Sequence, residues 1–505
     1  MGFFKRHKAL FLFGFGIIIF YFFTRLYNIL DLPIFTDEAI YIRWAQIAKQ
    51  DANWRFISLT DGKQPMFVWF AMILLRFVED PLLAGRLVSV GAGFASLIGI
   101  YFLGKEVFKS STVGLVSSVL YVVFPMSLVY DRMALYDSLV VAFAVWSLFL
   151  TVLLARKVRL DVALLLGIVI GGGVLTKTNA FFNLYLLPLS LILFDWKKKE
   201  KLSRLLKWVG LAVLVTFLGY LFYSILRLSP FFNIINEKNA LFVYPLKEWV
   251  EYPFAHFIGN WKAVWDWLVR YMTWPVLFLV GGSFFITRSF IKEKLLLLIW
   301  FLIPALALAV FGKTLYARFI FFMVVPLLVL AAFSLVNIYL KVKNKLFFGV
   351  LLIIIFALLA RSDYLILNNF GVSPIPVSDL GQYSNDWPSG GGVKEAVQFF
   401  NNEAKKGKIY IVTQGTFGLL PFAFEIYLVQ NPNVTIEGFW PIGDYTPQKV
   451  VEKSKQIPTF FVFYQPCPQC KSIGEAPSTW KELELVYQFS KDYGKKHFSV
   501  YRVMP

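Results

Sequence analysis

The stretch 35–69, FTDEAIYIRWAQIAKQDANWRFISLTDGKQPMFVW, carries two adjacent acids near its start and a lysine near its end. A carboxylate can act as general base on an incoming hydroxyl, which makes Asp37 and Glu38 candidate catalytic residues. Thr36 and Asp37 also stand where a helix N-cap is expected, before the amphipathic segment IYIRWAQIAK, so capping is an equally good interpretation. Lys63 could hold a phosphate as a point charge, although a lone lysine more often snorkels to lipid headgroups.

Three further cations and one further acid stand at the ends of apolar runs. Arg86 lies inside LLAGRLVSVGAGF, where an ionisable residue is costly and usually faces a cavity or a partner. Lys177 interrupts GGGVLTKTNAFF, and Arg318 precedes the apolar run RFIFFMVVP; each could instead snorkel. Asp137 begins the next apolar run, where it could orient a substrate or a second carboxylate. Such cations facing a pair of acids suit a phosphate leaving group and a general base.

Other chemistries find less support. The chain has no P-loop, no GxGxxG after a strand and no HExxH, and it has only three histidines. Asp37, Glu38 and Asp137 could bind a divalent metal, but acids at this density do not demand one, and no other cofactor is indicated. In YDRMALYD, Asp131 could form a structural salt bridge with Arg132 or another neighbour; the alternative is that Asp137 of this hairpin orients a substrate or the second carboxylate.

The composition is that of a polytopic membrane protein. Of the 505 residues 58% are hydrophobic, and the mean hydropathy is +0.63. The net charge of +19 invites a nucleic-acid interpretation. However, the basic residues cluster beside the ends of apolar runs, where they orient spans and meet anionic headgroups. We therefore expect membrane lipids as partners and no nucleic acid.

Apolar runs of spanning length predict about eleven transmembrane helices, at 9–30, 82–104, 113–130, 138–155, 160–176, 180–195, 206–228, 270–288, 294–311, 317–339 and 345–361. With this number and a cytoplasmic N-terminus, the basic clusters all fall on the cytoplasmic side. The agreement requires that the short run 65–77 does not cross, so we predict juxtamembrane helices in the loop 31–81. That loop, and everything after residue 361, would then be extracellular or periplasmic.

The composition changes after residue 361. We predict a membrane domain over 1–361, containing the catalytic loop 31–81, and an external soluble α/β domain over 362–505. VKEAVQFFNNEAKKG has helical spacing, and KIYIVTQG and PTFFVFYQ have strand composition. The pair Cys467 and Cys470 could be a disulfide, a redox pair or half a zinc site; an external compartment favours the disulfide.

As an ordered set, TDEAIYIRWAQ, GKQPMFVWF, AGRLVSVGAGF and DRMALYDSL resemble the membrane-embedded GT-C glycosyltransferases. The resemblance is to the protein O-mannosyltransferase, aminoarabinose-transferase and RgtA/B/C/D-like group. It covers residues 9–200 and, more loosely, the segment GKTLYARFIFFMVVP. Two departures stand out: Lys63-Gln64-Pro65 replaces the family's Lys-Pro-Pro, and Gly62 replaces the acid of the aminoarabinose branch. For the second reason we do not carry over that branch's sugar.

The resemblance implies inverting transfer of a sugar from a polyprenyl-phosphate donor to a hydroxyl of a glycan, lipid or protein at the external face. It implies that Asp37, beside Glu38, is the catalytic carboxylate, that Asp137 is the second-loop aspartate, and that Lys63 and Arg318 face the donor phosphate. Arg86 and Lys177 complete the expected phosphate site. The alternative is a transporter or lipid flippase, which should show ionisable residues near mid-membrane and broken helices in two matching halves.

Overall fold

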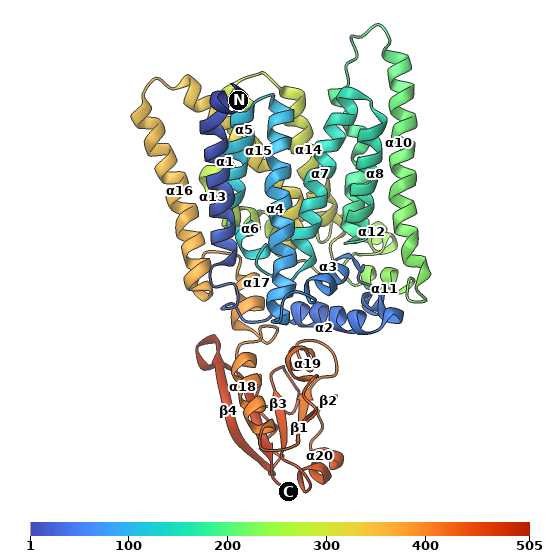
Figure 1. Ribbon diagram of the computed structural model, residues 1–505, viewed down its shortest axis with the longest axis vertical. Helices are drawn as coiled ribbons and strands as arrows, with labels where there is room; N and C mark the ends of the chain where they lie inside the picture. Colours follow the sequence, from blue (N-terminus) through green and yellow to red (C-terminus); the bar gives the residue numbers. More distant parts are fainter. Residues whose placement is uncertain (1) are drawn as a thin grey trace.

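The computed structural model describes residues 2–505, with side chains from residue 12 onward. A helical bundle forms one part of the molecule, and a small sheet domain lies beyond one end of it (Figure 1). Within the described residues, seven helices or helix pairs are long and apolar enough to cross a membrane. They are α4 (Pro81–Phe108), α7 (Tyr136–Lys157), α10 (Lys201–Ser224) with η5 (Ile225–Leu228), α13 (Phe257–Ile286), α14 (Ile291–Phe311), η6 (Ala317–Ile320) with α15 (Phe321–Lys341), and α16 (Lys345–Asn368).

Four shorter apolar helical stretches complete the bundle. They are the latter part of α1 (Gly2–Leu26), α5 (Ser111–Val122), α8 (Leu160–Val174), and the run formed by η3 (Thr178–Phe181), α9 (Phe182–Tyr185) and η4 (Leu187–Leu193). Helices suit a lipid environment because they satisfy every backbone polar group internally. The polytopic helical fold predicted from the apolar runs is confirmed. The largest difference lies in α13, which begins earlier than expected and is broken at Thr273, before Pro275.

The first loop forms two helices that do not cross the bundle. α2 (Thr36–Gln50) lies across the end of the bundle that faces the sheet domain, as Figure 1 shows. α3 (Met66–Leu74) has 9 residues, which span roughly 14 Å at the rise of an α-helix and cannot cross a hydrocarbon core of about 30 Å. Both helices are juxtamembrane, as predicted. Three short helices lie at the same end of the bundle: α6 (Pro125–Tyr130), α11 (Ile234–Ala240) and α12 (Leu246–Glu251).

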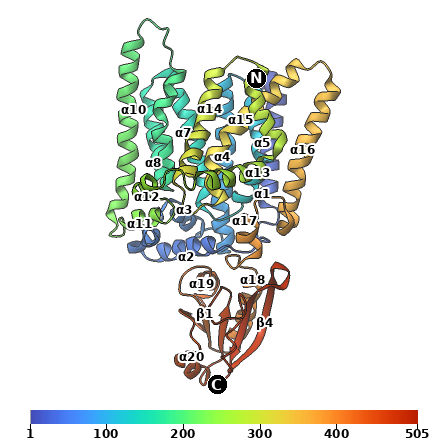
Figure 2. The same cartoon turned by 180° about the vertical axis from the view of Figure 1, so that it is seen from behind.

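The basic connections gather at the other end of the bundle. Arg156 bonds to Glu106 and to Glu293, so that the connections after α4, α7 and before α14 lie together. Lys341, at the end of α15, donates to the carbonyl of Ile286 at the end of α13. The lysine- and arginine-rich end is therefore opposite the end that carries α2 and the sheet domain (Figure 2).

The C-terminal domain is a mixed sheet with helices packed against it. Its strands lie in the order β2-β1-β3-β5-β4, with β1 parallel to β2 and β3, and β5 antiparallel to β3 and β4. The segments WKELELVYQFSKD and HFSVYRV both form strands. The elements are α18 (Val393–Ala404), β1 (Ile409–Gln414), α19 (Phe422–Leu428), β2 (Val434–Phe439), α20 (Gln448–Ser454), β3 (Thr459–Phe463), β4 (Leu483–Lys491) and β5 (Lys496–Val503).

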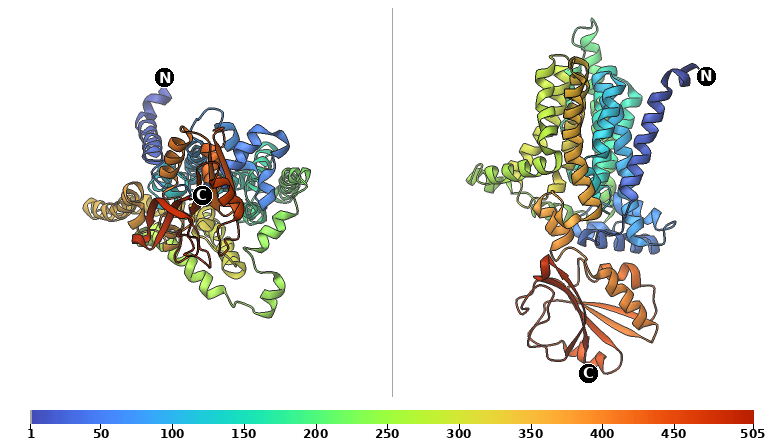
Figure 3. Two further views of the ribbon diagram at one scale, coloured as in Figure 1. Left: turned by 90° about the horizontal axis from the view of Figure 1, so that it is seen from below. Right: turned by 90° about the vertical axis from the view of Figure 1, so that its left-hand side faces the viewer.

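The sheet domain contacts the bundle through α2 (Figure 3). α19 packs against α2, where Arg43 pairs with Glu425 at 2.6 Å and Gln46 donates to the carbonyl of Ile426 at 2.9 Å. The backbone of Thr36 donates to Pro388 at 3.0 Å, just beside the candidate acids. The domain thus rests on the helix that begins with Asp37.

The linker between the two parts runs through α17 (Val377–Leu380) and the short π-helical η8 (Gly381–Asn385). Asp379 of α17 is fully buried. It accepts hydrogen bonds from Tyr130, at 2.6 Å, and from Tyr271. The linker is therefore anchored inside the end of the bundle, between α6 and α13.

Candidate active site

Asp37 lies in the first turn of α2 and faces a cavity at the end of the bundle that carries the sheet domain. Its carboxylate pairs with the Arg318 guanidinium of η6 at 3.0 Å. Burial works to raise the pKa of Asp37, but the attraction of Arg318 and of three cavity lysines outweighs it, so the pKa is lowered. The carboxylate is therefore ionised at neutral pH, and it is held by Arg318, which is distant from Asp37 in the sequence.

Lys63 reaches the same cavity from the loop between η2 (Ile57–Asp61) and α3. Burial, and to a smaller extent the repulsion of nearby cations, lowers its pKa to about 8, while Asp37 acts in the opposite direction. Among the residues that the structure describes, no carboxylate lies within salt-bridge distance of Lys63, whose nitrogen lies over the Phe242 ring at 5.6 Å. Its charge is therefore available to a ligand.

The two departures from the family motif have local explanations. Gly62 adopts a left-handed conformation, with φ +64°, and a Cβ there would lie 2.5 Å from the Cβ of Lys238. The glycine lets the loop pack closely on α11, which an acid at this position would prevent. Gln64 donates to the Thr178 hydroxyl at 2.7 Å and ties the lysine loop to η3. Both residues fix the position of Lys63.

Asp137 and Lys177 face the cavity as a pair. Lys177, in the connection between α8 and η3, donates to the Asp137 carboxylate at 2.8 Å. Its nitrogen also lies 4.8 Å from the centre of the Phe319 ring. Asp137 begins α7, so the pair joins two helices at the rim of the site.

Glu38 and Arg86 do not line the cavity. The Arg86 guanidinium donates to both carboxylate oxygens of Glu38, at 2.9 and 2.8 Å, and both side chains are fully buried. Glu38 also accepts from the backbone of Phe35 at 2.9 Å and of Ala134 at 2.7 Å. This network joins the start of α2 to α4 and to the hairpin before α7. The two residues thus contact each other and the scaffold, and neither lines the cavity that Asp37 faces.

Two features of the site were missed by the sequence reasoning. Lys238 of α11 lines the cavity and pairs with Asp61 at 2.6 Å. Tyr41 and Tyr136 form an edge-to-face pair, with ring centres 4.5 Å apart, beside Asp37. Lys238 lies in the long connection 229–269, which carries no motif, so only the fold reveals its place. Tyr41 could have been found, because it lies one helical turn after Asp37.

The cavity has a volume of about 870 Å³. Its lining includes the acids and cations described above. Apolar residues of η3, α9, α14 and α15 also line it; among them are Phe181, Phe182, Leu308, Phe311, Phe322 and Met323. The arrangement offers charged side chains to an anionic group and an apolar surface to a hydrocarbon chain.

The three candidate metal ligands do not form one ligand set. Asp37 pairs with Arg318, Glu38 with Arg86, and Asp137 with Lys177. Among residues 12–505 no group of three or more His, Cys, Asp or Glu side chains is placed to hold a metal ion. We therefore derive no catalytic step through a metal. In the sheet domain, Cys467 and Cys470 are joined by a disulfide.

The chain matches one protein-family model and is similar in fold to several solved structures. A model described as dolichyl-phosphate-mannose-protein mannosyltransferase matches residues 62–223. No match to a curated protein is found. ArnT from Cupriavidus metallidurans in the apo state is similar over 99% of this chain and 98% of that one, with 13% identity and a TM-score of 0.57. Its form bound to undecaprenyl phosphate gives 12% identity and a TM-score of 0.56 over 98% of each chain.

The archaeal oligosaccharyltransferase AglB from Archaeoglobus fulgidus, in complex with an inhibitory peptide and a dolichol-phosphate, is also similar. The match has a TM-score of 0.51 and 13% identity, and covers 91% of this chain and 69% of that one. Identities this low establish shared architecture. The resemblance indicated by the sequence motifs is confirmed: the chain has the fold of the GT-C superfamily of membrane glycosyltransferases.

Proposed function

We propose that this protein transfers a sugar from a polyprenyl-phosphate donor to an acceptor hydroxyl, with inversion at the anomeric carbon. The single observation that carries the proposal is the cavity that Asp37, Lys63, Lys177 and Arg318 line together with apolar residues of the membrane helices. In this proposal the polyprenyl chain lies against the apolar lining residues of α9, α14 and α15, and the phosphate binds the cations. The similar folds bound to undecaprenyl phosphate and dolichol-phosphate support this class of donor.

In the proposed reaction the acceptor oxygen attacks the anomeric carbon from the face opposite the phosphate. The bond from that carbon to the phosphate oxygen breaks, and the phosphate leaves with the electron pair. Asp37 takes the proton of the acceptor hydroxyl. Lys63, Lys177 and Arg318, joined by Lys238, stabilise the charge that develops on the departing lipid phosphate.

The lowered pKa of Asp37 makes it a weak base in the empty site. A donor phosphate that binds the cavity cations would offset their field at the carboxylate and raise the pKa of Asp37 towards its ordinary value. Donor binding would thus prepare the base. Glu38 and Arg86 act in this scheme as positioning residues, because they hold the first turn of α2 in place, and Asp137 positions Lys177.

We further propose that the site faces the outside of the membrane. The end of the bundle opposite to the site carries the lysine- and arginine-rich connections, which by the positive-inside rule favours a cytoplasmic position for that end and for the N-terminus. The sheet domain would then be extracellular or periplasmic. It covers α2 and leaves the acceptor, a glycan, lipid or protein, to enter beside it.

Substitution of the proposed base tests this function. Asp37→Asn preserves size and removes the negative charge, so we expect transfer from a lipid-phosphate sugar to fall by about 10²- to 10⁴-fold. Donor binding should persist, because the cations remain. Product formation by the purified protein in proteoliposomes, identified by mass spectrometry, measures the effect.

Asp266→Asn is the matched control, since Asp266 is an exposed residue of α13 that pairs with Arg270 outside the cavity. This variant should retain full activity. Undiminished transfer by Asp37→Asn would exclude Asp37 as base. Lipid flux across the bilayer without any glycosyl product would favour a flippase instead.

A further inference from the structure

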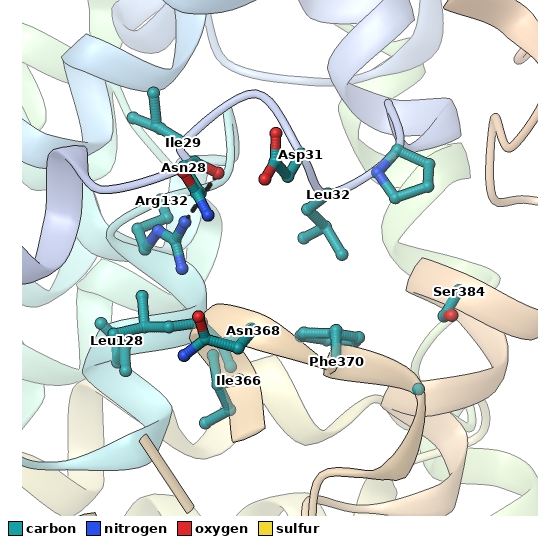
Figure 4. A pocket seen from close by; sticks show the side chains of 14 residues that line it. Asn28, Ile29, Asp31, Leu32, Leu128, Arg132, Ile366, Asn368, Phe370 and Ser384 are labelled. Atoms are coloured by element: carbon teal, nitrogen blue, oxygen red, sulfur yellow. Dashed lines mark hydrogen bonds between the residues drawn. The ribbon is translucent and has the colours of Figure 1, made fainter. Parts of the chain in front are cut away.

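A second, smaller cavity opens at the sheet-domain end of the bundle, between the ends of α1 and α16. Its volume is about 240 Å³, and it shares no lining residue with the donor cavity. The connection after α1 forms one side, and the end of α16 with the following linker forms the other (Figure 4). The Tyr27 hydroxyl donates to Asn368 at 3.4 Å and joins the two helices at this point.

Arg132 is the main charged group in the wall of this cavity. Arg132 is only 7% exposed. Nη2 donates to the carbonyl oxygens of Tyr27 and Asn28 at 2.7 and 3.0 Å, which fixes the guanidinium after the end of α1. Nε is buried and has no hydrogen-bond partner among the described residues. The carbonyl contacts therefore account for only part of the donor capacity of the side chain.

The charge of Arg132 is not neutralised by an ion pair. Over residues 12–505 no carboxylate lies within 4 Å of it; the adjacent Asp131 instead contacts the buried Arg25, at 3.5 Å. Burial, followed by the repulsion of Arg86 and Arg25, lowers the pKa of Arg132 to about 10, with Asp31 acting in the opposite direction. The guanidinium stays charged at neutral pH, and an anion would relieve the cost of its burial.

Asp31 contributes the opposite charge to the same cavity. It is exposed, and no cation lies within 4 Å of its carboxylate in the described part of the chain. Figure 4 shows Asp31 and Arg132 on the side formed by the connection after α1, with Asn368 and Phe370 across the cavity. The cavity thus presents the guanidinium of Arg132 and the carboxylate of Asp31, which are not paired with each other. The polar side chains of Asn28 and Ser384 also line it.

The helices on either side of the cavity expose apolar side chains. Among them are Phe23 and Leu26 on α1, and Leu358 and Tyr364 on α16. In a bilayer, the acyl chains of a lipid can lie along this surface while the headgroup reaches the ends of the two helices. Such a lipid would place its headgroup in the cavity, which lies at the sheet-domain end of both helices.

We propose that this cavity binds the headgroup of a zwitterionic phospholipid, with the phosphate on Arg132 and a primary ammonium on Asp31. Arginine suits a phosphate because its guanidinium presents several donors in a plane. A primary ammonium can donate to the Asp31 carboxylate and to the Asn368 amide oxygen, which a quaternary ammonium cannot do. The lipid occupies a site separate from the donor cavity, so the proposal does not depend on the proposed glycosyl transfer.

The test uses the full-length protein in detergent, to which palmitoyl-oleoyl lipids are added. Native mass spectrometry would measure the retention of phosphatidylethanolamine, phosphatidylglycerol and phosphatidylcholine. We expect phosphatidylethanolamine to bind about tenfold more tightly than the other two. Arg132→Gln should reduce its retention about tenfold, whereas Asp31→Asn should remove the preference over phosphatidylglycerol.

Arg227→Gln is the matched control, because Arg227 is an exposed arginine at the same end of the bundle and lines neither cavity. It should bind phosphatidylethanolamine as the unchanged protein does. Equal retention of the three lipids, or an Arg132→Gln variant with unchanged retention, would overturn the proposal. If Arg132→Gln does not fold, the Asp31→Asn variant still tests the proposal, because Asp31 is exposed. An unchanged lipid preference in Asp31→Asn would overturn the proposal.

The source of the headgroup is tested by competition. Soluble glycerophosphoethanolamine, added at the concentration of the lipid, should not displace phosphatidylethanolamine, because it lacks the acyl chains that contact α1 and α16. Displacement at equal concentration would show that the cavity recognises a free headgroup, and would overturn the assignment to a membrane lipid.

Discussion

Asp37 and Lys63 line the same cavity, but over the part of the chain that the structure describes only Asp37 has an oppositely charged partner. The carboxylate has an arginine partner at 3.0 Å, while the lysine has no carboxylate partner among the described residues and loses part of its proton affinity to burial. An uncompensated buried lysine is unfavourable in the empty protein, and a bound phosphate would remove the penalty. The most sensitive reporter of donor binding is therefore Lys63.

This gives a pH dependence for donor binding. The pKa of Lys63 is about 8 in the empty site, and a bound phosphate would raise it. Donor affinity should therefore be full below pH 8 and decline as the pH rises through that value, by at most about tenfold per pH unit. A phosphodiester does not titrate in this range. Isothermal titration of a polyprenyl-phosphate sugar between about pH 7 and pH 9.5 would measure the decline.

Lys63→Arg provides the comparison, because an arginine keeps its charge throughout this range. Donor affinity of this variant should be nearly independent of pH. If it declined as steeply as that of the unchanged protein, another group would be responsible for the titration.

At the scale of elements, α2 is the part of the loop 31–81 that packs against the sheet domain. Sequence periodicity and charge predicted α2 and α3 as juxtamembrane helices, because a short apolar run cannot span and a counted span would have reversed the basic loops. The same reasoning could not show that Glu38 turns to Arg86, or that α11 supplies Lys238. Those contacts join residues far apart in the chain, and their spacing leaves no pattern in the sequence.

The contact between α2 and α19 gives a second prediction. Arg43→Glu places two negative charges opposite each other at a partly buried pair. We expect this to weaken docking by about 1 kcal/mol, so that backbone amides of α19 exchange hydrogen about fivefold faster. The double variant Arg43→Glu/Glu425→Arg should restore the pair and the slower exchange. Equal exchange in all three proteins would mean that apolar packing alone holds the domain.

At the scale of the whole molecule, bundle and sheet domain are joined through a buried acid in the linker. The helix from VKEAVQFF and two of the strands could be predicted from composition and spacing. The anchoring of Asp379 between Tyr130 and Tyr271 could not, since a lone aspartate in SPIPVSDLGQ looks like part of a solvated turn. α16 also continues past the composition change, to Asn368.

Asp379 gives the junction a pH dependence. Burial raises its pKa to about 6, although the tyrosine hydrogen bonds oppose the shift. Between its ordinary pKa and 6 the folded state binds more protons than the unfolded state, so stability should fall as the pH rises to about 6 and then stay level. The slope is at most about 1.4 kcal/mol per pH unit. Thermal unfolding in detergent between about pH 4.5 and 7.5 would measure it.

Asp379→Asn should lose this part of the pH dependence, because the amide does not titrate. Asp386→Asn is the matched control from the same linker; Asp386 is more exposed and pairs with Lys496 at 2.9 Å, away from the tyrosines. This variant should follow the unchanged protein. If the stability of Asp379→Asn depended on pH in the same way as that of the unchanged protein, another buried acid would be responsible for the titration.

The two acids that begin α2 are neighbours in the chain but serve opposite sides of the helix. Consecutive side chains of a helix point about 100° apart. Asp37 therefore lines the cavity, while Glu38 contacts Arg86 in the interior of the bundle. Their order is therefore as informative as their presence. A homologue with the pair inverted would keep the same charge and composition. It would nevertheless send the longer side chain into the cavity and leave Arg86 with an acid too short to reach the same backbone donors.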